Sequence, residues 1–200
     1  MLFRRRDDMR LYHGSRTGGI EVLEPRIADH GQPYIYFSTI EAVAALYLCN
    51  AVERPYYWFP YGFRRDQPDV PVYDELYPNA LREVSEGVSG WIYYADVEED
   101  QVLPFKNIPC ARLSVEPVRV DGVIEVPDAY GLLRDYEARG KLVIGRYEEK
   151  TQRELQWYAR TIRDYMAQKQ MHLTPECAYA RFIRRKFPDV WKQFIEEGEK

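Results

Sequence analysis

Two short stretches hold residue types that could do chemistry together. The first, His13-Gly14-Ser15, follows an apolar start and runs into two further glycines, which is typical of a strand that ends in a tight turn. The second, Tyr34 to Phe37, is typical of an aromatic strand. An imidazole from one strand and a phenol ring from its neighbour can hold a flat ligand. The competing interpretation of His13 is a hydrogen-bonded structural histidine.

The hydrophobic pattern predicts the elements that must position these residues. Ser38 and Glu41 match a capping box, which predicts a helix from about Thr39 to Val52. The remaining strands of this part are expected at 10–14, 91–97, 115–120, 123–126 and 141–144, with helices at 77–86 and 127–138. The aromatic and proline-rich segment 55–78 has no clean period, and it could be a packed loop or a lid over a site.

After Gly145 the pattern becomes helical. Thr151 and Glu154 form a second capping box, which predicts a helix over about 150–169, and further helices are expected after Thr174-Pro175 and around Trp191. We therefore expect an α+β domain over 1–145 and a C-terminal helical extension over 146–200 that packs on it.

Composition narrows the classes of function. The chain has 200 residues, of which 46% are hydrophobic, so it can bury a core, and its net charge of −4 argues against general binding to nucleic acid or anionic membranes. The three cysteines, Cys49, Cys110 and Cys177, lack the spacing of a zinc site or a disulfide framework, so no metal and a reducing, cytoplasmic location are expected. An apolar run long enough for a membrane span is absent from the sequence.

Residues 11–17 and 35–37, followed by a helix containing Tyr47, resemble the NAD-binding core of ADP-ribosyltransferases of the His-Tyr-Glu class. The catalytic domains of poly(ADP-ribose) polymerases are the closest likeness. The resemblance extends in outline over about residues 10–135, and it implies a split β-sheet core with NAD as co-substrate.

The resemblance also assigns roles to individual residues. It implies that His13 binds the adenosine ribose, that the Gly14 backbone holds the nicotinamide amide, and that Tyr36 and Tyr47 stack on the nicotinamide ring from its two sides. Ser15 is a further hydroxyl beside this site. Stacking of a flat, electron-poor ring on a phenol contributes about 1 kcal/mol per contact.

The third member of the motif is a glutamate that binds the nicotinamide ribose and stabilises an oxocarbenium-like transition state. Glu116 is the first candidate for it and Glu125 the second. The resemblance thus implies His13, Tyr36 and Glu116 as catalytic residues. A solvent-facing role is the competing interpretation of either glutamate.

The chain departs from the polymerase pattern at two points. The polymerases have a serine in the helix that binds the carboxamide, and Ala44 stands at that position. The loop between His13 and Tyr36 is shorter than in the polymerases, which favours transfer of single ADP-ribose units. The C-terminal helices have no counterpart in the family and could bind a protein partner.

The sequence thus predicts a mono-ADP-ribosyltransferase, with a toxin-like or phage-related role compatible with this core. Its acceptor, whether protein, nucleic acid or small molecule, is left open. One alternative is an inactive module of the same fold that binds NAD, ADP-ribose or a protein. Another is an NAD-dependent RNA 2′-phosphotransferase, against which the acidic balance of the chain argues.

Overall fold

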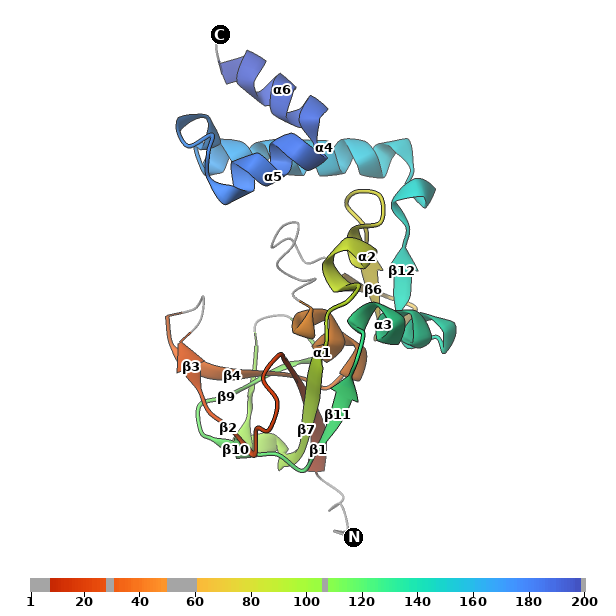
Figure 1. The fold of residues 1–200 in the computed structure, drawn as a ribbon, viewed down its shortest axis with the longest axis vertical. Coiled ribbons are helices and arrows are strands. Elements are labelled where there is room, and N and C mark those ends of the chain that lie inside the picture. The colour runs from red at the N-terminus through yellow and green to blue at the C-terminus, as the bar shows by residue number, and fades with distance from the viewer. Residues whose placement is uncertain (1–7, 28–30, 50–60, 106–107, 199–200) are drawn as a thin grey trace. The chain divides into compact units, whose positions relative to one another are not determined.

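The computed structural model describes residues 8–27, 31–49, 61–105 and 108–198 (Figure 1). The chain divides into two compact units: Met1–Tyr73 with Leu81–Ile144, and Asp74–Ala80 with Gly145–Lys200. The mixed α+β class expected from the sequence is confirmed. The segment 74–80, which lies within the expected first domain, belongs to the second unit.

A seven-stranded antiparallel sheet forms the centre of the first unit. Its strands are β1 (Asp8–Ser15), β3 (Arg26–Ile27), β4 (Pro33–Ser38), β7 (Gly90–Glu98), β8 (Leu103–Pro104), β9 (Ala111–Ser114) and β11 (Gly122–Val126). They follow the order β11-β7-β1-β4-β9-β8, with β3 paired to β4. A separate pair joins β2 (Val22–Leu23) to β10 (Val118–Arg119), and the 3-10 helix η1 (Glu99–Gln101) follows β7.

The sheet is nearly divided between β1 and β4. Strand β1 is in register with β7 over its whole length, from Asp8 opposite Glu98 to Ser15 opposite Trp91. With β4 it shares a single registered pair, Tyr12 opposite Ser38. Figure 1 shows β4 and β9 running across the direction of β1 and β7. The two halves, β11-β7-β1 and β4-β9-β8, therefore separate beyond the pair of Tyr12 and Ser38.

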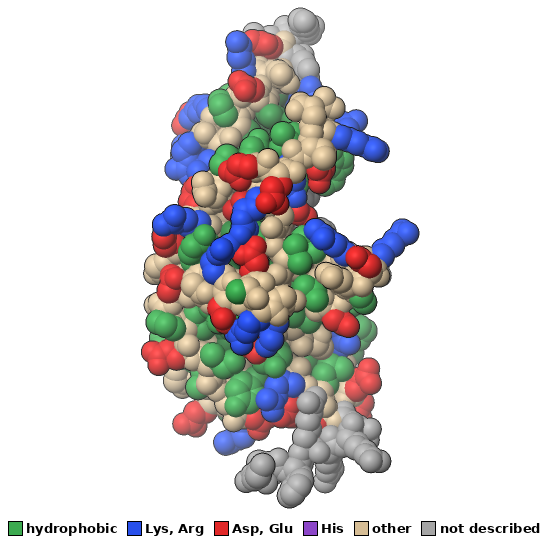
Figure 2. Space-filling view, turned by 90° about the vertical axis from the view of Figure 1, so that its right-hand side faces the viewer, with side chains coloured by type: hydrophobic (Ala, Val, Ile, Leu, Met, Phe, Trp, Pro, Cys, Tyr) green, Lys and Arg blue, Asp and Glu red, His purple; other side chains and the backbone are tan. Residues whose placement is uncertain are grey.

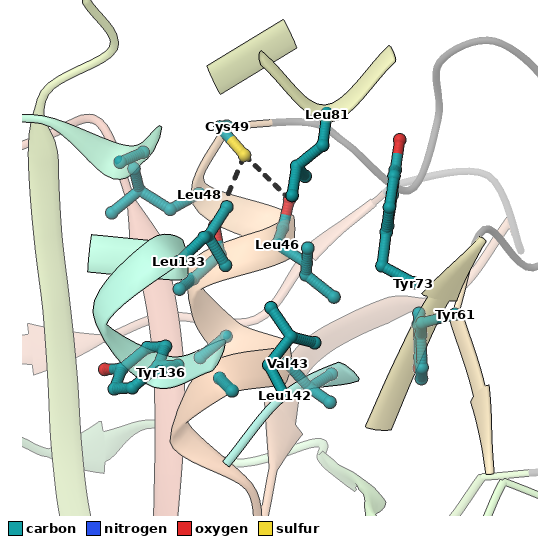
Figure 3. Close-up of a cluster of buried hydrophobic side chains, with 14 of the residues drawn as sticks. Val43, Leu46, Leu48, Cys49, Tyr61, Tyr73, Leu81, Leu133, Tyr136 and Leu142 are labelled. Carbon is teal, nitrogen blue, oxygen red and sulfur yellow. Dashed lines mark hydrogen bonds between the residues drawn. The ribbon is translucent and has the colours of Figure 1, made fainter. Parts of the chain in front are cut away.

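Two apolar clusters cover the two faces of the sheet. On one face, α1 (Glu41–Leu48) lies between side chains of α3 (Ala129–Ala138) and of the hairpin formed by β5 (Tyr61–Arg64) and β6 (Gln67–Asp74) (Figure 3). The helix α2 (Ala80–Ser85) contributes Leu81 to this cluster, and β12 (Val143–Gly145) extends the hairpin to three strands. On the other face, a second cluster contains Leu11, Ile35, Phe37 and Tyr93.

The second unit is mainly helical. Its elements are η2 (Tyr147–Glu149), α4 (Gln152–Gln168), η3 (Met171–Leu173), α5 (Ala178–Lys186) and α6 (Pro188–Gly198). The capping box predicted at Thr151 and Glu154 is confirmed, since each side chain accepts the backbone N–H of the other residue. Lys150, whose side chain is 7% exposed, pairs with the Asp74 carboxylate and so ties the segment 74–80 to the start of α4.

Several expectations about the elements are wrong. The Ser38–Glu41 capping box does not form: the N-cap of α1 is Ile40, and Ser38 accepts the Ile40 N–H instead. The helix ends at Leu48 with Cys49 as its C-cap, and Val52, where its end was expected, lies outside the described residues. The strand expected over 115–120 is replaced by β9 before it and the two-residue β10 within it. In the second unit, Cys177 rather than Thr174 caps α5.

The segment 55–78 is only partly a loop. Residues 55–60 lie outside the described residues, and 61–74 form the β5–β6 hairpin. In the ranges that the structure describes, no helix is long and apolar enough to cross a membrane. Figure 2 shows acidic and basic side chains interspersed over the face that it draws, in keeping with the small net charge of −4.

Candidate functional site

The imidazole of His13 spans the gap where β1 and β4 separate. Its Nδ1 lies 2.9 Å from the backbone oxygen of Tyr36, and its ring meets Phe37 edge-on at a centroid distance of 6.1 Å. Burial lowers the pKa of His13, the bond to Tyr36 opposes this shift, and the positive charge of Arg26 adds to it. The ring is therefore neutral at pH 7.

The tautomer of His13 follows from its partner. A carbonyl oxygen only accepts, so Nδ1 carries the proton and donates it to Tyr36. In the neutral ring, Nε2 then has a free lone pair. Within the described ranges no hydrogen bond to this nitrogen is found. His13 is therefore held by one nitrogen and can accept a ligand hydroxyl with the other.

Gly14 is fixed by the close approach of α1. A Cβ added at Gly14 would lie 2.2 Å from the Ala44 backbone oxygen and 3.0 Å from the Cβ of Leu48. The residue therefore has to be glycine for α1 to pack on β1. Among the residues that the structure describes, β1 has no registered partner on the β4 side beyond Tyr12, which is compatible with the expected role of the Gly14 backbone in holding an amide.

Ser15 and the residues after it form a turn against β7. The Thr17 N–H donates to Ser15 Oγ at 3.1 Å, and the Tyr93 hydroxyl donates to the Thr17 oxygen at 2.8 Å. A Cβ at Gly18 would lie 2.7 Å from the Trp91 ring. The turn is thus shaped by two aromatic residues of β7, which the sequence did not single out for this role.

Tyr36 and Tyr47 each belong to a cluster of aromatic rings. Tyr36 meets Tyr34 and Phe105 edge-on, at centroid distances of 6.1 and 5.9 Å. Tyr47, in the last turn of α1, meets Tyr61 edge-on at 6.1 Å and remains 45% exposed. Phe105 and Tyr61 were not predicted as site residues, since nothing in the local sequence shows that Phe105 lies beside Tyr36 or that Tyr61 lies beside Tyr47.

The strand registers place His13 and Tyr36 on different faces of the split sheet. Residues directly opposite each other on paired strands point to one face, and the faces alternate along a strand. Tyr36 shares the face of Ser38 and Tyr12, which α1 covers, whereas His13 points to the face of Phe37. The two motif residues meet through the Tyr36 carbonyl, which accepts from His13 Nδ1.

The two candidate glutamates lie in different places. Glu125 on β11 stands opposite Trp91, which stands opposite Ser15, so Glu125, Ser15 and His13 share a face. Two strand spacings separate the Cα atoms of Glu125 and Ser15 by about 10 Å. Glu116 is exposed in the turn between β9 and β10, where Ser114 binds its backbone. Glu125 therefore lies on a strand of the same half-sheet as His13, in line with Ser15, whereas Glu116 lies beyond the end of β9.

Comparisons with family models, with curated proteins and with solved structures gave no match. Among the described residues, no group of three His, Cys, Asp or Glu side chains could hold a metal ion.

Proposed function

We propose that the chain is a mono-ADP-ribosyltransferase that uses NAD as co-substrate. The observation that carries this proposal is the hydrogen bond from His13 Nδ1 to the Tyr36 carbonyl, across the gap between two half-sheets. It fixes a neutral imidazole with Nε2 ready to accept a hydroxyl, as binding of a ribose requires. The resemblance of the two motif strands to the His-Tyr-Glu family supports the same ligand.

The surroundings of His13 suit an extended, anionic dinucleotide. The adenosine ribose binds Nε2 of His13, and the positive charge of Arg26, on β3 opposite Tyr34 of β4, favours an anionic diphosphate. The nicotinamide lies on the α1 face, against Tyr36 and the exposed ring of Tyr47. Its amide pairs with backbone groups beside Gly14 on the edge of β1 that faces β4, where the registered pairing stops at Tyr12.

The reaction breaks the bond between C1′ of the ribose and the nicotinamide nitrogen, and the electron pair leaves with nicotinamide. The acceptor forms a new bond to C1′ and loses a proton. A carboxylate near the ribose stabilises the positive charge that develops in between. Glu125 lies on the face of His13 and Ser15, so in this proposal the nicotinamide ribose stays on that face and the nicotinamide ring crosses the edge of the sheet to Tyr36.

Nicotinamide release from NAD by the purified protein tests the proposal. We expect release by the wild-type protein and its loss in His13→Ala. His172→Ala is the matched control, because His172 is exposed and its ring contacts Phe194 in the second unit. Equal release by wild type and His13→Ala would contradict the proposal, as would the absence of both NAD binding and release in the wild-type protein.

One observation favours a second candidate function, an inactive module that binds NAD or ADP-ribose. Tyr93 on β7 stands opposite His13 on one side and opposite Val123 of β11 on the other, so the position in line with His13 holds a valine and not a carboxylate. If Glu125 cannot reach the ribose from the next row, the site binds the dinucleotide without cleaving it. Saturable NAD binding with no nicotinamide release would establish this second function.

A further inference from the structure

The turn that follows β1 is held by a single phenol hydroxyl. The hydroxyl of Tyr93 donates to the backbone oxygen of Thr17 at 2.8 Å and accepts the backbone N–H of Ile20 at 3.3 Å. Ser15 Oγ accepts the Thr17 N–H at 3.1 Å, so Thr17 is held at both of its backbone groups. Figure 1 shows this segment, in red, turning back beside β7 toward β2. Tyr93 therefore fixes both ends of the segment 17–20.

A second contact to the same turn comes from Trp91. A Cβ added at Gly18 would lie 2.7 to 3.0 Å from three atoms of the indole, so the ring of Trp91 lies directly against the Gly18 backbone. Tyr93 is 1% exposed and belongs to the apolar cluster on this face of the sheet, against which Trp91 and Ile20 also pack. The turn is therefore fixed by a buried hydroxyl and an indole ring, both from β7.

The fixed turn lies next to His13. Tyr93 stands directly opposite His13 in the register of β1 and β7, so the two side chains project from the same face of the sheet. The Cβ atoms of such a pair are about 5 Å apart. Because the Tyr93 hydroxyl bonds to the backbone at 17 and 20, that backbone crosses the end of the side chain beside the imidazole. The turn therefore lies beside any ligand that His13 binds.

We infer that Tyr93 is a positioning residue for the dinucleotide site. Its hydroxyl holds the segment 17–20 as a preformed wall beside the imidazole of His13, and the ligand packs against this wall. The ligand is the ADP-ribose part of NAD, and in that respect the inference rests on the proposed function. A turn that is ordered only on binding costs free energy, whereas a turn that is already held costs less. Tyr93 is buried, so it acts through the turn and not by touching the ligand.

Two measurements on the full chain test this inference. The first is amide hydrogen exchange in ¹⁵N-labelled protein. Tyr93→Phe keeps a ring in the apolar cluster and removes only the hydroxyl, so we expect the Ile20 N–H to exchange about five- to tenfold faster than in the wild type. Tyr136→Phe is the matched control, because Tyr136 is also buried and its hydroxyl donates to Glu41 in the cluster on the other face.

The second measurement compares the affinities for ADP-ribose and for free nicotinamide. The turn lies on the face of His13, and the proposed function places nicotinamide on the α1 face. We therefore expect Tyr93→Phe to weaken ADP-ribose binding about three- to tenfold and to leave nicotinamide binding unchanged. Gly18→Ala, which pushes the turn away from Trp91, should have the same two effects. Gly62→Ala is its control, since a Cβ there meets nothing within 4 Å.

The outcomes separate the positioning role from the proposed function. An Ile20 amide that exchanges equally fast in wild type and Tyr93→Phe, or an ADP-ribose affinity that Tyr93→Phe leaves intact, would overturn the positioning role. Equal losses for ADP-ribose and nicotinamide would also overturn it, because they would show a general loss of structure. A wild-type protein that binds neither ligand would refute the proposed function, and faster Ile20 exchange in Tyr93→Phe would then leave only the hold of Tyr93 on the turn.

Discussion

The imidazole Nδ1 of His13 lies 2.9 Å from the backbone oxygen of Tyr36, and this bond takes the place of the ladder that β1 and β4 do not form. Strand β1 pairs with β7 over its full length and with β4 at one residue pair. A side chain therefore joins the two half-sheets next to the pair of Tyr12 and Ser38. The same bond selects the tautomer of the ring and leaves Nε2 for a ligand.

The free energy of unfolding is expected to decrease as the pH is lowered, because of His13. Burial lowers its pKa below 6.5, so as the pH falls below 6.5 the unfolded chain takes up the proton before the folded one does. His13 therefore makes its full contribution to the free energy of unfolding above pH 6.5. This contribution decreases as the pH falls from 6.5 to the pKa that His13 has in the folded protein. The slope is at most about 1.4 kcal/mol per pH unit.

Urea unfolding of wild type and His13→Gln between pH 5 and 8 measures this effect, with both proteins in the same buffers. The difference between the two free energies of unfolding should be flat above about pH 6.5 and shrink below it. A difference that is constant over the whole range would show that His13 titrates as it does in the unfolded chain.

Replacing Gly14 by alanine should destabilise the protein. The added Cβ would lie 2.2 Å from the Ala44 backbone oxygen, and α1 must shift to relieve the clash. Overpacking of this kind costs about 1–3 kcal/mol or more. Gly62→Ala on β5 is the control, since a Cβ there meets nothing within 4 Å. Urea midpoints that fall equally in both variants, or in neither, would contradict the close packing of α1 on β1.

The two candidate glutamates should differ in their effect on nicotinamide release. Glu125 shares a face with His13 and Ser15, and Glu116 lies in an exposed turn beyond β9. We expect Glu125→Gln to slow release about 100-fold or more with NAD affinity kept, because a charge that stabilises the transition state is lost. Glu116→Gln should release nicotinamide at the wild-type rate. Slow release in Glu116→Gln with wild-type release in Glu125→Gln would instead assign the transition-state carboxylate to Glu116.

Removing either partner of the Lys150–Asp74 ion pair should destabilise the second unit, but by different amounts. Lys150 is 7% exposed at its side chain and Asp74 is 45% exposed. Asp74→Asn leaves a buried cation without its counter-charge and should cost about 1–2 kcal/mol after allowance for screening at the exposed carboxylate. Lys150→Met removes the cation itself and should cost less. Thermal unfolding of the two variants checks this order, and a larger loss in Lys150→Met would reverse the explanation.

The same sequence signal succeeded at one helix and failed at another. Thr151 and Glu154 form their capping box because both side chains lie at an exposed helix start with no better partner. At α1, Ser38 accepts the Ile40 N–H, and Glu41 accepts from the Tyr136 hydroxyl of α3. Tyr136 is 95 residues away in the sequence, so the local pattern could not reveal this partner.

The site was predictable in its residue types but not in its geometry. The two motif strands and β7, which pairs with β1, follow from local sequence, and so do His13 and Tyr36 as candidates. Which face each residue occupies depends on the register of Tyr12 with Ser38 and on the splitting of the sheet, which are set by packing between segments. The hairpin at 61–74 escaped prediction because Pro68 and Pro71 interrupt its alternation.

The account depends most directly on the free Nε2 of His13, and ¹⁵N NMR of the histidine ring can observe it. In the unliganded protein at pH 7, we expect the neutral tautomer with the proton on Nδ1, assigned by its loss in His13→Gln. Addition of NAD should shift the Nε2 signal toward that of a hydrogen-bonded acceptor and leave His172 unchanged. A proton on Nε2, or a His13 spectrum that NAD does not alter, would contradict a dinucleotide site at His13.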